Sequence, residues 1–68
     1  MQNIKIVKRP VVELVTGLSR SSIYAKMENG SFPKAVKLGI RSVGWLEHEI
    51  QSWIESRISE SRNEAIQC

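Results

Sequence analysis

The chain contains no aspartate, only one histidine and only one cysteine, and these shortages exclude several classes of function. An enzyme that works by nucleophilic attack needs a nucleophile beside a base, but the serine and glutamate residues here are expected on separate faces. His48 has no cysteine or second histidine near it in the sequence, so we expect no metal site. The sequence therefore predicts a protein that is not an enzyme and that needs no cofactor or small-molecule ligand.

Long apolar runs are missing as well. No run approaches the roughly 18 residues that a membrane-spanning helix needs, and no signal peptide is visible. The single cysteine, Cys68, is the last residue and cannot pair within the chain, so we interpret it as a free thiol on a terminal tail. These features predict a soluble, cytoplasmic protein without a membrane partner.

The length of 68 residues and the apolar content of 41% predict one domain over residues 1–68, with a small hydrophobic core. Residues 1–6 are expected to form an extended N-terminal arm. Beyond about Ser59 the sequence loses most of its apolar residues, so residues 59–68 are predicted to be a frayed tail.

A first short helix is predicted over residues 10–16. Pro10 suits the first helical position, where its missing N–H costs nothing, and Gly17 is a typical C-cap. The apolar residues in and after this segment recur at helical spacing and predict one buried stripe. The stripe consists of Val11, Leu14, Val15 and Leu18.

A second helix is predicted over residues 20–29, one tight turn after the first. Ser19 is a suitable N-cap, and Gly30 marks the end of the helix. Ile23 and Met27 are four residues apart and form an inward stripe, whereas the other side chains are mostly small or charged. Two helices joined by a turn that contains glycine are typical of a helix-turn-helix, in which the second helix enters the DNA major groove.

The apolar pattern changes to period two between Ala35 and Trp45, which predicts a two-stranded hairpin with a basic, exposed tip at residues 39–41. The type of turn stays open, because Gly-Ile-Arg matches no strongly typed two-residue loop.

After the hairpin, one apolar stripe predicts a last helix. The stripe consists of Leu46, Ile50, Trp53, Ile54 and Ile58.

Together these elements predict a mainly α fold with a small β-hairpin, in which the hairpin forms the wing of a winged helix-turn-helix. Both tryptophans are expected on core faces, and we favour burial over a role in stacking on nucleic-acid bases. The predicted core consists of Leu14, Leu18, Ile23, Phe32, Leu38, Trp45, Ile50 and Trp53.

The charges are distributed unevenly along the chain. The net charge is +3, but residues 1–45 hold eight lysine and arginine residues against two glutamates, a net of +6. Residues 46–68 hold two arginines against five glutamates, a net of −3. A basic front and an acidic back orient a small protein on a polyanion, so the pattern favours double-stranded DNA as the partner.

Three motifs in order carry a family resemblance: TGLSRSSIY at residues 16–24, GSFPK at 30–34, and VKLG with RSVGWL within 36–46, followed by the helix at 49–54. In these residues the chain resembles the AlpA-type prophage regulators, winged-helix proteins related to phage excisionases and to MerR-like DNA-binding domains. The resemblance covers roughly residues 7–58. It implies sequence-specific DNA binding and control of integrase expression or of element excision. The chain departs from the family pattern at Ala25-Lys26, where the family often has a cation directly after the tyrosine. This departure affects which DNA sequence we expect the protein to bind.

The second helix supplies the first group of candidate DNA contacts. Arg20, Ser21 and Lys26 are candidates for the major groove, because an arginine can bind guanine O6 and N7 together and a serine can reach a base or a phosphate. Ser22 is expected either to contact DNA or to complete the N-cap of the helix. Tyr24 is expected either to donate its hydroxyl to a phosphate or, as the favoured interpretation, to pack its ring in the core.

The wing supplies the second group. Arg41 at the hairpin tip, with Ser42 beside it, is suited to insertion in a narrow minor groove. Lys34 and Lys37 flank the tip and are expected over phosphates. Neighbouring protomers on repeated sites are a further expected partner. The alternative hypothesis is a protein-interaction module that docks on a host regulator through the acidic last helix.

Overall fold

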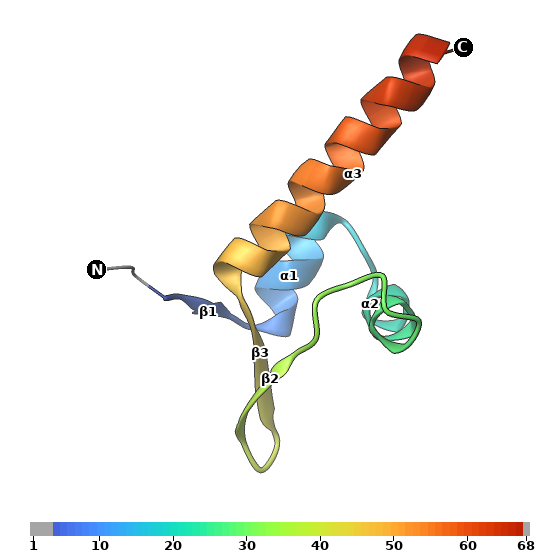
Figure 1. The fold of residues 1–68 in the computed structure, drawn as a ribbon. Coiled ribbons are helices and arrows are strands. Elements are labelled where there is room, and N and C mark those ends of the chain that lie inside the picture. The colour runs from blue at the N-terminus through green and yellow to red at the C-terminus, as the bar shows by residue number, and fades with distance from the viewer. Residues whose placement is uncertain (1–3, 68) are drawn as a thin grey trace.

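The computed structural model describes residues 4–67, with side chains as far as Asn63, and it shows three helices around a small sheet (Figure 1). In chain order the elements are β1 (Ile6–Val7), α1 (Arg9–Thr16), α2 (Arg20–Glu28), β2 (Val36–Gly39), β3 (Ser42–Leu46) and α3 (Glu47–Gln67). The predicted fold class, a mainly α winged helix-turn-helix with a β-hairpin, is confirmed. Each predicted helix is present, although the ends shift by a few residues.

The sheet has one strand more than the sequence predicted. Its order is β1-β3-β2 and both pairings are antiparallel, so β3 is the central strand. Residue Ile6, which was expected in an extended arm, pairs with Leu46, and the next pair is Val7 with Trp45. The arm prediction for the first three residues lies outside the described residues. A two-residue strand is too short to carry a recognisable alternation, and pairing with β3 is what defines it.

The wing turn consists of Ile40 and Arg41, and neither residue has a positive φ. The turn is therefore not one of the primed types that fit a regular two-residue hairpin. Instead the register slips by one residue between Lys37 and Gly39, which makes Leu38 the extra residue of a bulge. The bulge accommodates a turn that ordinary residues can adopt.

Leu38 is not part of the core, so its prediction as a core residue is wrong. The side chain is 45% exposed, and its Cδ1 would lie 3.2 Å from a Cβ placed on Gly44. Successive residues of β3 point to opposite faces of the sheet, so Leu38 covers the face opposite Trp45. The sequence correctly predicted that Leu38 alternates with Lys37 along β2, but it assigned Leu38 to the buried face of the sheet.

Five buried side chains form the core: Val12, Ile23, Phe32, Trp45 and Ile50. Four of them were predicted, and Val12 was not. Leu18 and Trp53, also predicted, are half-buried and pack against this cluster.

The orientation of α1 differs most from the prediction. Leu14 is 81% exposed, and its stripe neighbours Val11 and Val15 are exposed too, so the core prediction for Leu14 is wrong. The inward face instead centres on Val12, with half-buried Arg9 and Thr16 three residues before and four residues after it, and half-buried Glu13 at its edge.

A short connection explains this orientation. A single residue, Lys8, links β1 to α1, so the pairing of β1 with β3 sets the rotation of the helix about its axis. The polar groups on the inward face find local partners. Arg9 Nε donates to Glu13 Oε2 at 3.0 Å, and the Thr16 hydroxyl donates to the carbonyl oxygen of Val12 at 2.6 Å.

The last helix is longer than expected. A frayed tail was predicted over residues 59–68, but α3 continues to Gln67 and projects beyond the other elements (Figure 1). The side chains from Glu55 to Asn63 are exposed, and Arg57 forms an ion pair with Glu60. None of the helices that the structure describes is long and apolar enough to span a membrane. The tail residue Cys68 lies outside the described residues.

A pair of valine and leucine substitutions in α1 tests the rotation of this helix. Val12→Ala should lower the free energy of unfolding by about 2 kcal/mol, because it leaves a cavity beside Trp45 in a closed core. Leu14→Ala removes a larger but exposed side chain and should change stability by less than about 0.5 kcal/mol. Urea unfolding of both variants measures the difference. The reverse order would mean that α1 buries the Leu14 face.

Candidate nucleic-acid interface

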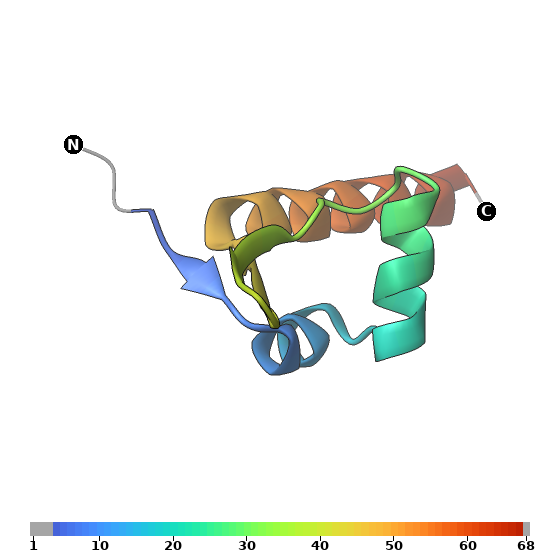
Figure 2. The same ribbon diagram turned by 90° about the horizontal axis from the view of Figure 1, so that it is seen from below.

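The helix-turn-helix is built by local interactions that the sequence predicted. Gly17 closes α1 in a left-handed conformation, with φ of 74°, and its N–H donates to the carbonyl oxygen of Glu13 at 2.9 Å. A side chain there would strain the turn. Figure 2 shows the result, in which α2 runs across the direction of α3 at one end of the molecule.

Ser19 starts α2 as predicted. Its Oγ accepts a hydrogen bond from the backbone N–H of Ser22 at 3.2 Å, and the two hydroxyl groups are 3.0 Å apart. The hydroxyl of Ser22 is therefore engaged in the cap. Of the two roles that the sequence left open for Ser22, the structure contains the one in the cap.

The exposed face of α2 brings together three of the predicted DNA contacts, Arg20, Ser21 and Tyr24. The Cζ atom of Arg20 lies 5.8 Å from the centre of the Tyr24 ring, a cation–π distance that orients the guanidinium along the helix. Tyr24 is 37% exposed and is not a member of the core. The favoured interpretation, a ring packed in the core, is therefore wrong.

Lys26 does not share this face. Residues six apart on a helix point about 120° away from each other, and Lys26 falls on the side that carries Ile23. Its side chain is half-buried, and its carbonyl oxygen accepts a hydrogen bond from the Ser31 N–H at 2.9 Å. The helix end around Lys26 therefore serves the turn that follows α2.

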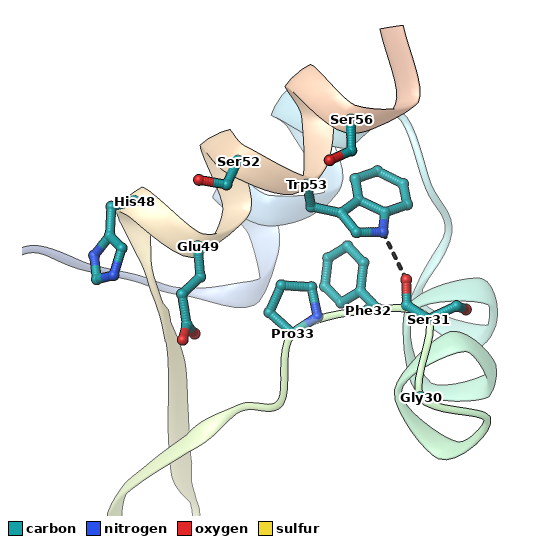
Figure 3. A pocket seen from close by; sticks show the side chains of 9 residues that line it. All are labelled: Gly30, Ser31, Phe32, Pro33, His48, Glu49, Ser52, Trp53 and Ser56. Atoms are coloured by element: carbon teal, nitrogen blue, oxygen red, sulfur yellow. Dashed lines mark hydrogen bonds between the residues drawn. The ribbon is translucent and has the colours of Figure 1, made fainter. Parts of the chain in front are cut away.

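The connection from α2 to the wing is held by two indole groups. Trp53 Nε1 donates to the carbonyl oxygen of Ser31 at 2.6 Å, and Trp45 Nε1 donates to that of Pro33 at 3.1 Å. Phe32 between them packs edge-on against Trp53, with ring centres 4.9 Å apart. Figure 3 shows the indole of Trp53 beside Phe32 and directed at Ser31. These contacts fix the position of α2 relative to the hairpin.

The same view shows a shallow pocket between this connection and α3, and His48 and Glu49 are among the residues that line it (Figure 3). Both side chains lie at the start of α3, and the pocket contains no cysteine or second histidine. No cluster of three or more histidine, cysteine or acidic residues that could hold a metal ion occurs in the part of the chain that the structure describes.

The wing presents Lys37 on β2 and Arg41 in the turn, and both side chains are exposed. Lys34 is exposed in the connection that leads to the wing. Ser42 is half-buried and accepts a hydrogen bond from Lys8 Nζ at 3.0 Å, a contact that the sequence gave no means of finding. At the tip the apolar side chain of Ile40 is 93% exposed.

The cations of this surface lack acidic partners. Between residues 4 and 63 the ion pairs are Arg9 with Glu13, at 3.0 Å, and Arg57 with Glu60. The exposed lysines and arginines of α2 and the wing, Arg20, Lys34, Lys37 and Arg41, form none. Their charge is therefore available to an anionic partner.

Comparison with known proteins places this arrangement in a family. Residues 5–58 match the family described as "Prophage CP4-57 regulatory protein (AlpA)". The chain belongs to the AlpA family. The match covers both helices of the helix-turn-helix, the wing and the packed part of α3, so it confirms the resemblance that the motifs indicated.

Two relatives of this AlpA-family chain differ in what their names say. The DNA-binding transcriptional activator AlpA of Escherichia coli K12 is 37% identical over 60 residues, which cover 79% of the chain and 86% of that protein. The uncharacterized protein ORF88 of Enterobacteria phage P4 is 40% identical over 55 residues, which cover 81% of the chain. The match spans only 62% of the phage protein's own length.

Serine substitutions at the start of α2 test the assignment of the cap. Ser19→Ala should lower the free energy of unfolding by about 1 kcal/mol, because it leaves the N–H of Ser22 without its acceptor. Ser21→Ala is the matched control, since that hydroxyl makes no hydrogen bond among the described residues, and its stability should be unchanged. Thermal unfolding of both variants provides the comparison. Equal losses for the two serines would contradict the cap.

Proposed function

We propose that this AlpA-family protein binds double-stranded DNA at specific sequences, with α2 in the major groove and the β2–β3 hairpin as the wing. The observation that carries the proposal is the exposed face of α2. Arg20 on this face forms no ion pair among residues 4–63, Ser21 is exposed next to it, and the hairpin that follows is basic. The rigid connection supports it, because readout of bases requires side chains held in place by their surroundings. The single winged domain is expected to work in the cytoplasm, where the DNA is.

The predicted contacts of α2 have a place in this proposal, except Ser22, whose hydroxyl is engaged with Ser19 in the cap. Arg20, held beside Tyr24, reads guanine, and Ser21 contacts a neighbouring base or phosphate. Tyr24 is 37% exposed, and its hydroxyl contacts a phosphate. Lys26 lies off the exposed face, so it approaches the backbone and does not read bases.

Phosphate contacts come from the flanks. Lys34 and Lys37 are exposed on either side of the start of β2, and they set the register of the protein on the duplex without reading sequence. Arg41 and Ser42 contact DNA at the wing. Insertion of Arg41 in the minor groove stays a prediction from the sequence.

The biological role is proposed from the relatives. The Escherichia coli relative is named a DNA-binding transcriptional activator, and the matching family is described as a prophage regulatory protein. We infer that this chain likewise regulates transcription for a prophage or integrative element, acting on integrase expression, on excision or on both. A helix of this length reads only a few base pairs, so repeated sites and neighbouring protomers would supply useful affinity.

A second candidate function rests on α3. Its second half projects from the molecule (Figure 1), and the described part of α3 as a whole is acidic, which suits docking on a basic surface of a host regulator. This part of α3 carries Glu47, Glu49, Glu55 and Glu60 against Arg57 and Arg62. Salt dependence separates the two functions, because binding through phosphates weakens steeply as counterions are released.

Paired substitutions distinguish readout of sequence from attraction to the backbone. Arg20→Ala should weaken binding to the specific site by roughly 1–3 kcal/mol and relax the base preference at one position. Lys37→Ala should weaken binding to every duplex about equally and lower the slope of log K against log salt by about one. Titrations on a specific and a random duplex at several salt concentrations measure both effects. Equal losses on both duplexes for both variants would make Arg20 a purely electrostatic contact.

A stepwise increase of protein level in cells tests the regulatory role. Because neighbouring protomers on repeated sites raise one another's effective concentration, the integrase transcript or the excised element should rise steeply with dose. The two outputs are measured separately, and Arg20→Ala at matched protein level is the control. If neither output changes while host regulators co-purify with the protein, the docking function replaces this one.

A further inference from the structure

A small hollow lies where the start of α1 meets the turn of the wing and the first residues of β3. Figure 2, seen along the hairpin, shows these two segments side by side. The residues around the hollow are Lys8, Arg9, Pro10, Arg41, Ser42 and Val43. Three of them are cations that come from segments far apart in the sequence, so the fold creates this cluster.

Only one of the three cations is neutralised. Arg9 is paired with Glu13 at 3.0 Å, whereas Lys8 and Arg41 have no carboxylate partner between residues 4 and 63. Lys8 Nζ instead donates to Ser42 Oγ at 3.0 Å, which holds the ammonium group beside the wing turn. Two cationic residues without a carboxylate partner in this range, together with Ser42, therefore line the same hollow.

Stability of the fold does not explain this placement. Lys8 and Arg9 stand at the N-terminal end of α1, where cations are disfavoured by the helix dipole, and the first turn contains no acidic residue. Bringing Arg41 to the same place adds repulsion between like charges. An anion in the hollow would relieve both effects.

We propose that this hollow binds one phosphate group of the DNA backbone, between Lys8 and Arg41, with the Ser42 hydroxyl as a further donor. The inference rests on the proposed DNA binding and deepens it. It adds Lys8, a residue outside the recognition helix and the wing, to the interface. It also assigns Arg41 to the backbone, which leaves Ile40 as the side chain at the tip of the wing.

The first test replaces Lys8 and compares the effect on DNA binding with that of replacing Lys5, a matched lysine in the same segment. Lys8→Ala should weaken binding to any duplex about eightfold at 0.1 M salt and lower the salt slope by about 0.9, the share of one phosphate contact. Lys5→Ala removes the same charge at the other end of β1, next to Glu47, and should change neither value. Lys8→Arg should restore the slope.

The second test identifies the phosphate. Single phosphates of the bound duplex are replaced one at a time by uncharged methylphosphonates. At one position the replacement should weaken the wild-type protein but leave Lys8→Ala unaffected, and Arg41→Ala should be insensitive at that same position. Thermal melting of each variant excludes loss of the fold, and Lys8→Gln, which keeps a donor for Ser42, replaces the alanine variant if that one unfolds.

The outcomes separate the hollow from the function on which it rests. If the wild-type protein shows no salt-dependent binding to duplex DNA, the proposed function fails and the hollow with it. If the wild type binds but Lys8→Ala behaves like Lys5→Ala, only the hollow is wrong. A loss confined to A·T-rich duplexes for Arg41→Ala would show minor-groove insertion. Stabilisation of the wild type by inorganic phosphate, without any effect of Lys8 on DNA binding, would indicate a site for free phosphate and also overturn the proposal.

Discussion

The fold depends on the close approach of β1 to the central strand β3 at Gly44. A Cβ at this position would collide with Ile6 Cγ2 and lie 3.1 Å from the carbonyl oxygen of Val7, so any larger residue would have to displace the Ile6 side chain and move β1 slightly away. On the opposite face of the same strand, Trp45 is fully buried. The pairing of β1 then sets the rotation of α1 through Lys8, and the burial of Trp45 anchors the helices. One strand therefore couples the wing, the N-terminal segment and the core.

The same strand controls the geometry of the interface. Recognition by a winged helix requires a fixed distance between the helix in the major groove and the wing. Here the segment between them is bound from both sides, by Trp45 from β3 and by Trp53 from α3, each donating an indole N–H to a backbone carbonyl. Two otherwise unpaired carbonyl oxygens are satisfied in this way, and the large rings fill the space behind them. The tryptophans thus act through position, since Trp45 is buried and Trp53 is half-buried beside Phe32.

Features that depend on neighbours in sequence could be predicted. The left-handed turn at Gly17, the cap at Ser19 and the inward position of Ile23 follow from local rules, and the structure confirms all three. Features that depend on distant segments could not. Periodicity found the apolar stripe of α1 but not the side that faces the core, which a strand of two residues decides. The face of Leu38 likewise depended on the register with β3, in which Val36 pairs with Gly44 and Lys37 pairs with Val43. The sequence predicted too short an α3 because apolar residues become rare after Ser59. Apolar residues indicate which part of a helix packs against the core, and an exposed helix can continue without them.

The candidate interface shows the same limit, with a consequence for its energetics. Residue types indicated a basic, DNA-binding front, but only the fold separates Lys26 from Arg20 and brings Lys8 to Ser42 across 34 residues. The fold gathers cations without carboxylates to balance them, and their repulsion lowers the stability of the free protein. A polyanion removes this repulsion only in the folded state, because the unfolded chain disperses the charges. Under the proposed function, DNA binding and folding are thermodynamically linked, and a bound duplex would stabilise this small core by a free energy that grows with the logarithm of the free duplex concentration. The repulsion between cations in the isolated domain would in this way contribute to the affinity that we propose for the duplex.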